Sequence, residues 1–551
     1  MKKFKNFSRK WAIIFLTLIL LPALYLMVKE PIYNSYDSLT HIARISEYHN
    51  AILESQFPPR IAPSVIDGIG YPLFVVNYHL PYIFCEIFMF LFNDARLAFK
   101  AVMSTTYILS GVFFYLLIKK HTSTTASLVA AITFSYLPYR FANLYFRGSL
   151  GESVALMFIV LVLLSLHYGQ NNFDHEARLK IGGSSAQGKK TLSIFFIALS
   201  VFGIITSHTV IFIIFAPFFA LYTILIIKPD KKSLFAISAG FILGILASSF
   251  QLLPSLFEKN YLKFDDSLFS IYTGQFVKFP QLYRLGGFGE NLGTYFQAGI
   301  VSGLIIFCAL LIFLFKRNFK ILFFLAFSLL ATFLVLNQSR FLWNNIILLK
   351  MMIFPWRFIS LIILCVSFLA AFELDLIYAK KIKFVLSFFL VVLVIYTSRH
   401  YFFYSGIQQQ IYPPASLSHF GENDPIWSSE ATYKNRPVIN SEPNVIAIKS
   451  VTAKPYEVTM ETSSTGDTST IVFRKLYFPG WRATVNNQKV ELYPFDGLIS
   501  LRLFAGINYI HLYYEQTTVE RFANLITLIT FFILIIIFLS STFWKKFSVL
   551  K

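Results

Sequence analysis

Long apolar runs recur along most of this chain, and they constrain its fold more than any other feature. Each run is about as long as the roughly 17–25 residues that an α-helix needs to cross a bilayer. The expected spans are 11–28, 98–118, 122–138, 151–168, 191–206, 208–228, 233–253, 298–315, 320–337, 357–379, 383–398 and 521–543. Only 14% of the residues are Asp, Glu, Lys or Arg, too few to cover a soluble protein of this length. The sequence therefore predicts a multi-pass membrane protein with about twelve helices.

The formal net charge is +20, and the placement of the basic residues explains it. Lys and Arg gather in short segments beside the apolar runs, at Lys2–Lys10, Lys119–Lys120, Arg178–Lys190, Lys228–Lys232, Lys316–Lys320, Lys380–Lys383 and Lys545–Lys551. Cytoplasmic loops of membrane proteins carry this excess. We therefore expect an integral membrane protein with both termini in the cytoplasm, with residues 29–97 (the first loop) and 399–520 outside, and with no nucleic-acid partner.

Other sequence features give little sign of a cleaved leader or a metal. The N-terminal run from Trp11 to Val28 is longer than a typical signal-peptide core and is followed by no small-residue cleavage site, so a retained anchor is expected. Cys85, Cys308 and Cys365 lie far apart in apolar stretches. Neither a disulfide framework nor a zinc site is indicated.

One apolar run, from Leu73 to Phe92, does not fit this path. Counting it as a span would place Lys119 and Lys120 outside, and its first half carries Asn77, His79 and Pro81. We interpret it as a re-entrant or interfacial part of the first loop, buried against protein. The alternative is an ordinary span with a misplaced loop.

The C-terminal part of the chain changes character. Residues 456–462, 470–477, 498–504 and 508–515 alternate apolar and polar side chains, as half-buried strands do. Asn486-Asn487 predicts a tight hairpin turn, because Asn tolerates a positive φ. We expect three regions: a polytopic domain at 1–398, an extracytoplasmic β-sandwich at 399–520, and a final helix with a basic cytoplasmic tail at 521–551.

Ionisable side chains near the expected spans gather at their outer ends. They come from separate segments: Asp37, His41 and Arg44; Arg140, Arg147 and Glu152; His208; and Arg340 and Arg357. Charges are costly in the middle of a membrane helix, so their placement is informative. The arrangement favours a site at the outer leaflet boundary for a substrate with a lipid tail and a polar head. Helix capping, headgroup anchoring or a hydrogen-bonded helix end would explain each residue individually.

Two local patterns indicate an anionic substrate. On a helix, Asp37, His41, Arg44 and Tyr48 share one face, which places a candidate base beside phosphate-binding groups. The segment from Arg147 to Glu152 carries glycines that would let backbone amides approach an anion at a helix start.

These residues resemble those of a known class. A first loop that opens with Asp37, followed by many helices and a C-terminal outer domain, resembles the GT-C class of membrane glycosyltransferases. The stretches 37–41, 70–72, 147–152, 207–208 and 354–357 look like bacterial membrane proteins labelled 6-pyruvoyl-tetrahydropterin synthase-related. Residues 477–485 are similar to the outer domain of proteins that glycosylate lipoteichoic acid.

The resemblance implies a specific chemistry. A polyprenyl-phosphate sugar would be the donor, Asp37 the catalytic base, and the other outer-face residues would bind substrate, with inversion at the anomeric carbon. The acceptor would be an envelope glycan, lipid or protein. Pterin chemistry is not expected, because no three His residues have metal-ligand spacing. No cofactor is implied, and a divalent cation is possible but not indicated, since no paired acids surround Asp37. Two other functions stay open: a flippase or transporter of lipid-linked sugars, and a non-catalytic envelope assembly protein.

Overall fold

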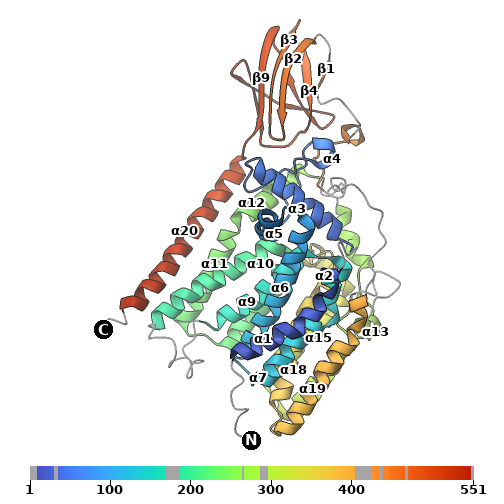
Figure 1. Cartoon of the computed structure of the whole chain (residues 1–551), viewed down its shortest axis with the longest axis vertical. Helices are drawn as coiled ribbons and strands as arrows, with labels where there is room; N and C mark the ends of the chain where they lie inside the picture. Colours follow the sequence, from blue (N-terminus) through green and yellow to red (C-terminus); the bar gives the residue numbers. More distant parts are fainter. Residues whose placement is uncertain are drawn as a thin grey trace.

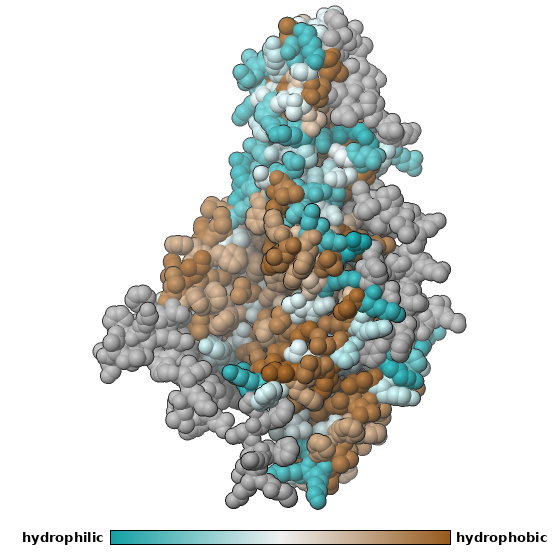
Figure 2. Space-filling view, viewed as in Figure 1, coloured by the Kyte–Doolittle hydropathy of each residue, from teal (hydrophilic) through white to brown (hydrophobic). Residues whose placement is uncertain are grey.

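The computed structural model describes residues 9–29, 35–168, 186–263, 266–285, 296–403, 423–433, 439–442, 445–465 and 469–547. A helical body carries a β region at one end, and α20 runs from that region along one side of the body (Figure 1). Apolar side chains cover much of the helical body, whereas polar ones dominate the β region (Figure 2). This distribution is that of an integral membrane protein with one water-exposed region.

The α-helices pack against one another in the helical body. They are α1 (Arg9–Leu20), α2 (Tyr25–Lys29), α3 (Ser38–Leu53), α4 (Val65–Gly68), α5 (Leu80–Phe92), α6 (Ala95–Ile118), α7 (Thr124–Tyr136), α8 (Pro138–Phe141), α9 (Leu150–Leu166), α10 (Ala186–Tyr222), α11 (Lys231–Ala247), α12 (Ser249–Phe257), α13 (Phe279–Leu282), α14 (Ile300–Lys316), α15 (Phe319–Val335), α16 (Arg340–Asn345), α17 (Ile347–Lys350), α18 (Ile359–Asp375), α19 (Lys380–Thr397) and α20 (Thr518–Phe547). A π-helical segment η2 (Ala142–Arg147) follows α8, and a 3₁₀ segment η9 (Pro355–Phe358) precedes α18.

Burial differs sharply among these helices. The segment Pro355–Asp375, which includes α18, is apolar all round and 89% buried over its most hydrophobic window, as expected of a helix at the centre of a bundle. The corresponding window of α20 is only 17% buried, so its apolar side chains face outward. A helix that exposes this many apolar side chains is suited to lipid.

The number of spans differs from the expectation. Within the described residues, five helices are long and apolar enough to cross a membrane, or up to seven if each bent pair is one span. Several expected spans, among them 122–138, 151–168 and 298–315, correspond to helices of 10–17 residues, shorter than the roughly 20 residues of a straight span. The count of twelve therefore stays a prediction.

The helix α10 folds back on itself. It continues through Ile227 as a 38-residue segment, which would extend about 57 Å if it were straight. Lys190 at its start nevertheless forms an ion pair of 3.1 Å with Asp230 just beyond its end. The backbone leaves helical geometry at His208, with φ −165° and ψ 90°. The chain therefore reverses at His208, which agrees with the two expected runs 191–206 and 208–228.

The ambiguous run 73–92 contains only one short helix, α5, of 13 residues. Leu73, Phe74 and Val75 before it are fully buried in the protein, while Ile87, Phe90 and Leu91 on α5 are exposed. A helix of this length does not cross a bilayer when it is straight. The helix α7, which falls in an expected span, has the same 13 residues, so the interpretation of 73–92 as re-entrant or interfacial stays a prediction.

The β region contains two antiparallel sheets. Strands β1 (Ile439–Glu442), β4 (Thr470–Leu476), β8 (Leu498–Arg502) and β7 (Tyr493–Phe495) form one, and β2 (Val445–Lys454), β3 (Glu457–Ser464), β9 (Gly506–Tyr514), β5 (Trp481–Val485) and β6 (Gln488–Val490) form the other. Inward-facing residues of both sheets share one core, for example Phe473, Trp481 and Leu512. Asn486 and Asn487 make the expected β5–β6 turn with φ of 49° and 65°.

Candidate functional site

Two distant segments meet at the start of α3. The backbone amides of Tyr36 and Asp37 donate to the carbonyls of Phe146 (2.8 Å) and Arg147 (2.7 Å). Gly148 follows with φ +65°, and a Cβ there would lie 2.1 Å from Ser35 Oγ. Only glycine fits this close approach, which aligns Asp37 with Arg147.

Arg147 is the centre of the cluster. Its guanidinium lies 2.6 Å from Glu152 Oε2 and 4.0 Å from Asp37 Oδ2. Asn143 Oδ1 accepts from it at 3.1 Å, and its flat face lies 4.5 Å from the Trp356 ring centroid. Burial lowers the pKa of Arg147, but the charges of Glu152 and Asp37 outweigh burial and raise it overall. The residue therefore stays cationic.

Glu152 is fully buried and holds Arg147 in place. Its Oε1 accepts from Tyr139 Oη at 2.6 Å and from Asn143 Nδ2 at 3.1 Å, while Oε2 binds Arg147. Both carboxylate oxygens are therefore engaged. The geometry gives Glu152 a positioning role, whereas the sequence indicated direct contact with substrate.

Arg357 is a second buried guanidinium beside this pair. It is 9% exposed, its Nη1 donates to the Met352 carbonyl at 2.8 Å, and it lies over the Phe354 ring at 4.8 Å. Arg147, Glu152 and Asp37 are all close enough to act on its charge. Within the described residues, no carboxylate forms an ion pair with Arg357, and its Nε has no hydrogen-bond partner. A buried cation of this kind is costly unless an anion accompanies it.

His41 lies on α3 among aromatic side chains. Its Nδ1 and Nε2 are each 3.3 Å from a tyrosine hydroxyl, of Tyr82 and Tyr78 respectively. Burial, followed by the charges of Arg44 and Arg147, holds the pKa of His41 well below its usual range, so the imidazole is neutral. The Tyr78 ring also stacks on His208, at 6.3 Å between centroids. His208 thereby reaches the cluster from the turn of α10.

The two remaining predicted residues differ in position. Arg44 is buried on α3 and acts on Tyr82 and His41, so it belongs to the cluster. Arg140 instead donates to Ser110 Oγ at 2.6 Å and lies 5.1 Å from the rings of Tyr107 and Phe134. Its guanidinium is therefore anchored on α6 and α7, and a substrate-binding role is not what this geometry favours.

The glycines near α9 serve packing rather than anion binding. A Cβ on Gly151 would lie 2.7 Å from both the Ser207 carbonyl and the Tyr78 ring. The amide of Ser149 already donates to the Asn143 carbonyl at 2.9 Å. The small residues allow α9, the first loop and the α10 turn to converge, which corrects the expectation of an open amide cradle.

Several site residues were missed by the sequence reasoning. Tyr139 and Asn143 precede Arg147 at four-residue intervals, a spacing that places side chains on one helical face and that would have revealed them. Trp356, in the stretch 354–357, is buried between Arg147 and Phe296, whose ring stacks on it at 3.9 Å. Tyr78 and Tyr82 lay in the unassigned run 73–92.

Among the residues that the structure describes, no group of three or more His, Cys, Asp or Glu side chains is arranged to hold a metal ion. At the candidate site, the Asp37 carboxylate lies 4.0 Å from the Arg147 guanidinium. The absence of a metal requirement stays a prediction.

Comparison with known proteins gives distant similarity. No protein-family model matches the chain, and the pterin-synthase label finds no support. An uncharacterised protein of Lactococcus lactis subsp. cremoris is 26% identical over 385 residues, 65% of this chain. The matched part spans 56% of that relative's length.

Solved structures show weaker similarity. The arabinofuranosyltransferase AftD from Mycobacteria matches with 14% identity and a TM-score of 0.45, over 72% of this chain and 28% of that one. The apo oligosaccharyltransferase of Archaeoglobus fulgidus matches with 14% identity and a TM-score of 0.44, over 79% of this chain and 59% of that one. ArnT from Cupriavidus metallidurans, bound to undecaprenyl phosphate, matches with 10% identity and a TM-score of 0.42, over 71% of this chain and 64% of that one.

Proposed function

We propose that this protein is a GT-C-type glycosyltransferase that moves a sugar from a polyprenyl-phosphate donor to an envelope acceptor outside the cytoplasmic membrane. The finer topology belongs to this proposal: about twelve spans, cytoplasmic termini and an extracytoplasmic β-sandwich. The observation that carries the proposal is Arg357, a buried guanidinium with no described carboxylate partner, beside the pair formed by Asp37 and Arg147.

The two arginines suit a phosphate. A guanidinium binds two phosphate oxygens at once, and buried charge-assisted hydrogen bonds are the strong ones. Arg147 is already oriented by Glu152 at 2.6 Å, while Arg357 has a free Nε. Negative charge grows on the departing lipid phosphate as the glycosidic bond breaks, so fixed cations there stabilise the transition state more than the ground state.

Asp37 suits the base. Its side chain is 34% exposed, whereas Glu152 is fully buried with both oxygens engaged. It stands at the N-cap of α3 but makes no side-chain capping bond. In the proposed step, Asp37 takes the proton of an acceptor hydroxyl, whose oxygen attacks the anomeric carbon while the lipid phosphate leaves from the opposite face. The hydroxyls of Tyr78 and Tyr82, which the neutral His41 holds in place, would hydrogen-bond the sugar.

A transfer assay tests the proposal. Purified protein is incubated with radiolabelled undecaprenyl-phosphate sugars and membrane extract, and label is followed into the acceptor fraction. We expect transfer by the wild type and none by Asp37→Asn. Movement of the lipid-linked sugar between leaflets without transfer would establish a transporter instead. A third outcome would establish an assembly protein: the purified protein shows neither activity, a deletion strain has an envelope defect, and expression of the Asp37→Asn variant repairs that defect.

A further inference from the structure

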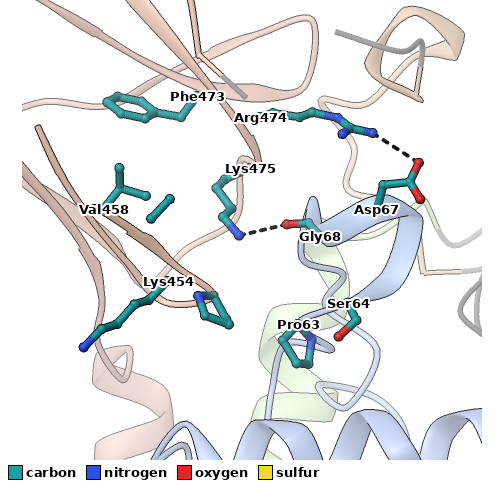
Figure 3. A pocket seen from close by; sticks show the side chains of 11 residues that line it. Pro63, Ser64, Asp67, Gly68, Lys454, Val458, Phe473, Arg474 and Lys475 are labelled. Carbon is teal, nitrogen blue, oxygen red and sulfur yellow. Dashed lines mark hydrogen bonds and ion pairs between the residues drawn. The ribbon is translucent and has the colours of Figure 1, made fainter. Parts of the chain in front are cut away.

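A cavity lies between the first loop and the β region (Figure 3). Its volume is about 480 Å³, in the range of small-molecule sites. It is lined by Pro63, Ser64, Asp67, Gly68, Ala453, Lys454, Pro455, Val458, Phe473, Arg474 and Lys475. None of these residues belongs to the candidate site around Asp37. The helix α4 that forms one wall sits between the helical body and the strands (Figure 1).

The cavity is built by matched contacts between β4 and the loop. Arg474 lies 3.5 Å from the Asp67 carboxylate, and Lys475 Nζ donates to the Gly68 carbonyl at 2.8 Å. The next amide along the strand, of Leu476, donates to the Ile69 carbonyl at 3.0 Å. Consecutive residues of the strand therefore hold consecutive residues of the loop, and the two walls of the cavity are fixed to each other.

The loop adopts an unfavourable backbone to form this wall. Ile66 and Asp67 have φ of 52° and 55°, and Gly68 has φ +83°. A left-handed conformation is costly for a β-branched residue such as Ile66. Such strain persists only where surrounding contacts enforce it, and it concentrates at binding and active sites. Here it turns the Gly68 carbonyl toward Lys475 (Figure 3).

The charge of the cavity is positive and poorly balanced. Arg474 and Lys475 extend toward the loop that carries one carboxylate, Asp67, whereas Lys454 lies at the rim and its ammonium points away from them (Figure 3). The Asp67 side chain is 87% exposed, so its pairing with Arg474 is weak and easily displaced. Lys475 is only 9% exposed, and its sole hydrogen-bond partner within the described residues is a neutral carbonyl. An ammonium has three donors, which leaves two for a ligand.

We propose that this cavity binds an anionic glycan segment, whose phosphate or carboxylate group is held by Arg474 and Lys475, with the exposed Lys454 at the rim. The position suits a chain that approaches from the β region, since the cavity walls include β2, β3 and β4. Its role as the acceptor rests on the proposed function, whereas binding itself does not. The glycan would then be anchored by its charge while a neighbouring hydroxyl reaches the transferase site.

Calorimetry on the purified full-length protein in detergent at low salt tests this assignment. The probes are oligo(glycerol phosphate), oligogalacturonate and neutral maltohexaose. We expect one or both anionic probes to bind, the neutral one not to bind, and affinity to fall as salt rises. Lys475→Met should bind about tenfold more weakly or worse, the scale of one charge-assisted hydrogen bond, and Lys454→Met, at the exposed rim, should lose less. Lys449→Met, an exposed lysine elsewhere on β2, is the matched control.

Asp67→Asn should change the affinity for the anionic probe in the opposite direction. Removing the competing carboxylate frees Arg474, so the anionic probe should bind more tightly. A cavity that served only to hold the loop would instead lose its walls, and binding would not improve. Lys454 and Asp67 are exposed, so these two variants remain informative even if Lys475→Met folds poorly.

Three results would overturn the assignment: no binding of either anionic probe by the wild type, equal affinity in a folded Lys475→Met, or weaker binding in Asp67→Asn. The transfer assay separates this failure from failure of the proposed function. Transfer without anionic binding refutes the cavity alone. Binding without transfer upholds the cavity and refutes the acceptor role.

Discussion

The carboxylate of Asp37 faces the guanidinium of Arg147 at 4.0 Å, and the Asp37 amide donates to the Arg147 carbonyl at 2.7 Å. The backbone hydrogen bond places the two side chains close together, because it fixes the positions of both Cα atoms whatever rotamers the side chains adopt. Glu152 holds the other edge of the guanidinium at 2.6 Å. Two residues far apart in the sequence thus form one preorganised pair.

We predict that Asp37→Asn retains folding and lipid binding but reduces turnover by about 100-fold or more, within the range of a positioned general base. Asn is nearly isosteric with Asp and cannot accept the proton. Transfer rates with saturating donor measure the loss, and a thermal unfolding curve in detergent checks the fold. Glu54→Gln removes an exposed acid at the far end of α3 and should leave the rate unchanged. A rate near that of the wild type in Asp37→Asn would remove the base from the mechanism.

Arg147→Lys and Arg357→Lys should each weaken donor binding although the charge is retained. An ammonium cannot bind two phosphate oxygens in the manner of a guanidinium, and a loss of roughly 1.5–3 kcal/mol is expected for a hydrogen bond between charged groups. Affinity for a water-soluble, short-chain donor analogue measures it, because general attraction to lipid headgroups is then removed. Arg340→Lys, at an exposed arginine, is the control. Equal affinity in all four proteins would assign both arginines to headgroup anchoring.

The positions of these residues could be inferred from the sequence only in part. Charge placement brought Asp37, His41, Arg44, Arg147, Glu152, His208 and Arg357 to one face, and the structure gathers them. Sequence position could not show that both carboxylate oxygens of Glu152 are bound by Tyr139 and Arg147. Nor could it show that Arg140 points toward Ser110. Those outcomes depend on side-chain directions, which hydropathy and spacing do not contain.

Fold prediction shows the same division. Alternation located β3, β4, β8 and β9, because these strands bury one face in the shared core, and the Asn486-Asn487 turn located the β5–β6 hairpin. It missed β2, where the described side chains at 448–453 are all exposed, and the three-residue β7, whose side chains are also exposed. Hydropathy also gave no sign that apolar runs such as 124–136 would form helices too short for a straight span.

Site-directed labelling tests the topology. Cysteines are introduced at Ser64, Ser450 and Lys381, all exposed positions, in a variant whose exposed native Cys308 is replaced by alanine. A membrane-impermeant maleimide should label the first two in intact spheroplasts and the third only after lysis, because the basic segment beside Lys381 is expected inside. Labelling of Lys381→Cys in intact spheroplasts would show that the chain has the opposite orientation in the membrane. Ser185, in the expected cytoplasmic linker, lies outside the described residues.

Glu520→Gln should destabilise the protein strongly. Glu520 pairs with Arg60 at 3.2 Å, with side chains 0% and 1% exposed, and so ties the first loop to α20. Removing one partner of a buried pair typically costs about 3–5 kcal/mol, because the other charge is left uncompensated. Thermal unfolding in detergent measures the loss of stability. The control is Glu461→Gln, which removes a pair with the exposed Lys449 and should cost about 0–1 kcal/mol of stability. Equal shifts would mean that Arg60 finds another partner.

The last prediction concerns stability at alkaline pH and depends on Lys475. Burial, and then the charge of Arg474, lower the pKa of Lys475 from its usual 10.5 to about 8. The groups that line the cavity with it are Lys454, Arg474 and Asp67. Below pH 8 both folded and unfolded chains carry the proton, so the folded state bears the full cost of a buried ammonium. Between about pH 8 and 10.5 the unfolded chain binds more protons than the folded one, and stability contributed by this group rises with pH. The melting temperature of the wild type should therefore gain, relative to Lys475→Met, when pH is raised from about 7 to 9.5. Other titrating groups are common to both proteins and cancel in the difference, and Lys449→Met should follow the wild type. Parallel pH responses in wild type and Lys475→Met would show that Lys475 keeps an ordinary pKa, and the cavity would then hold a solvated ammonium.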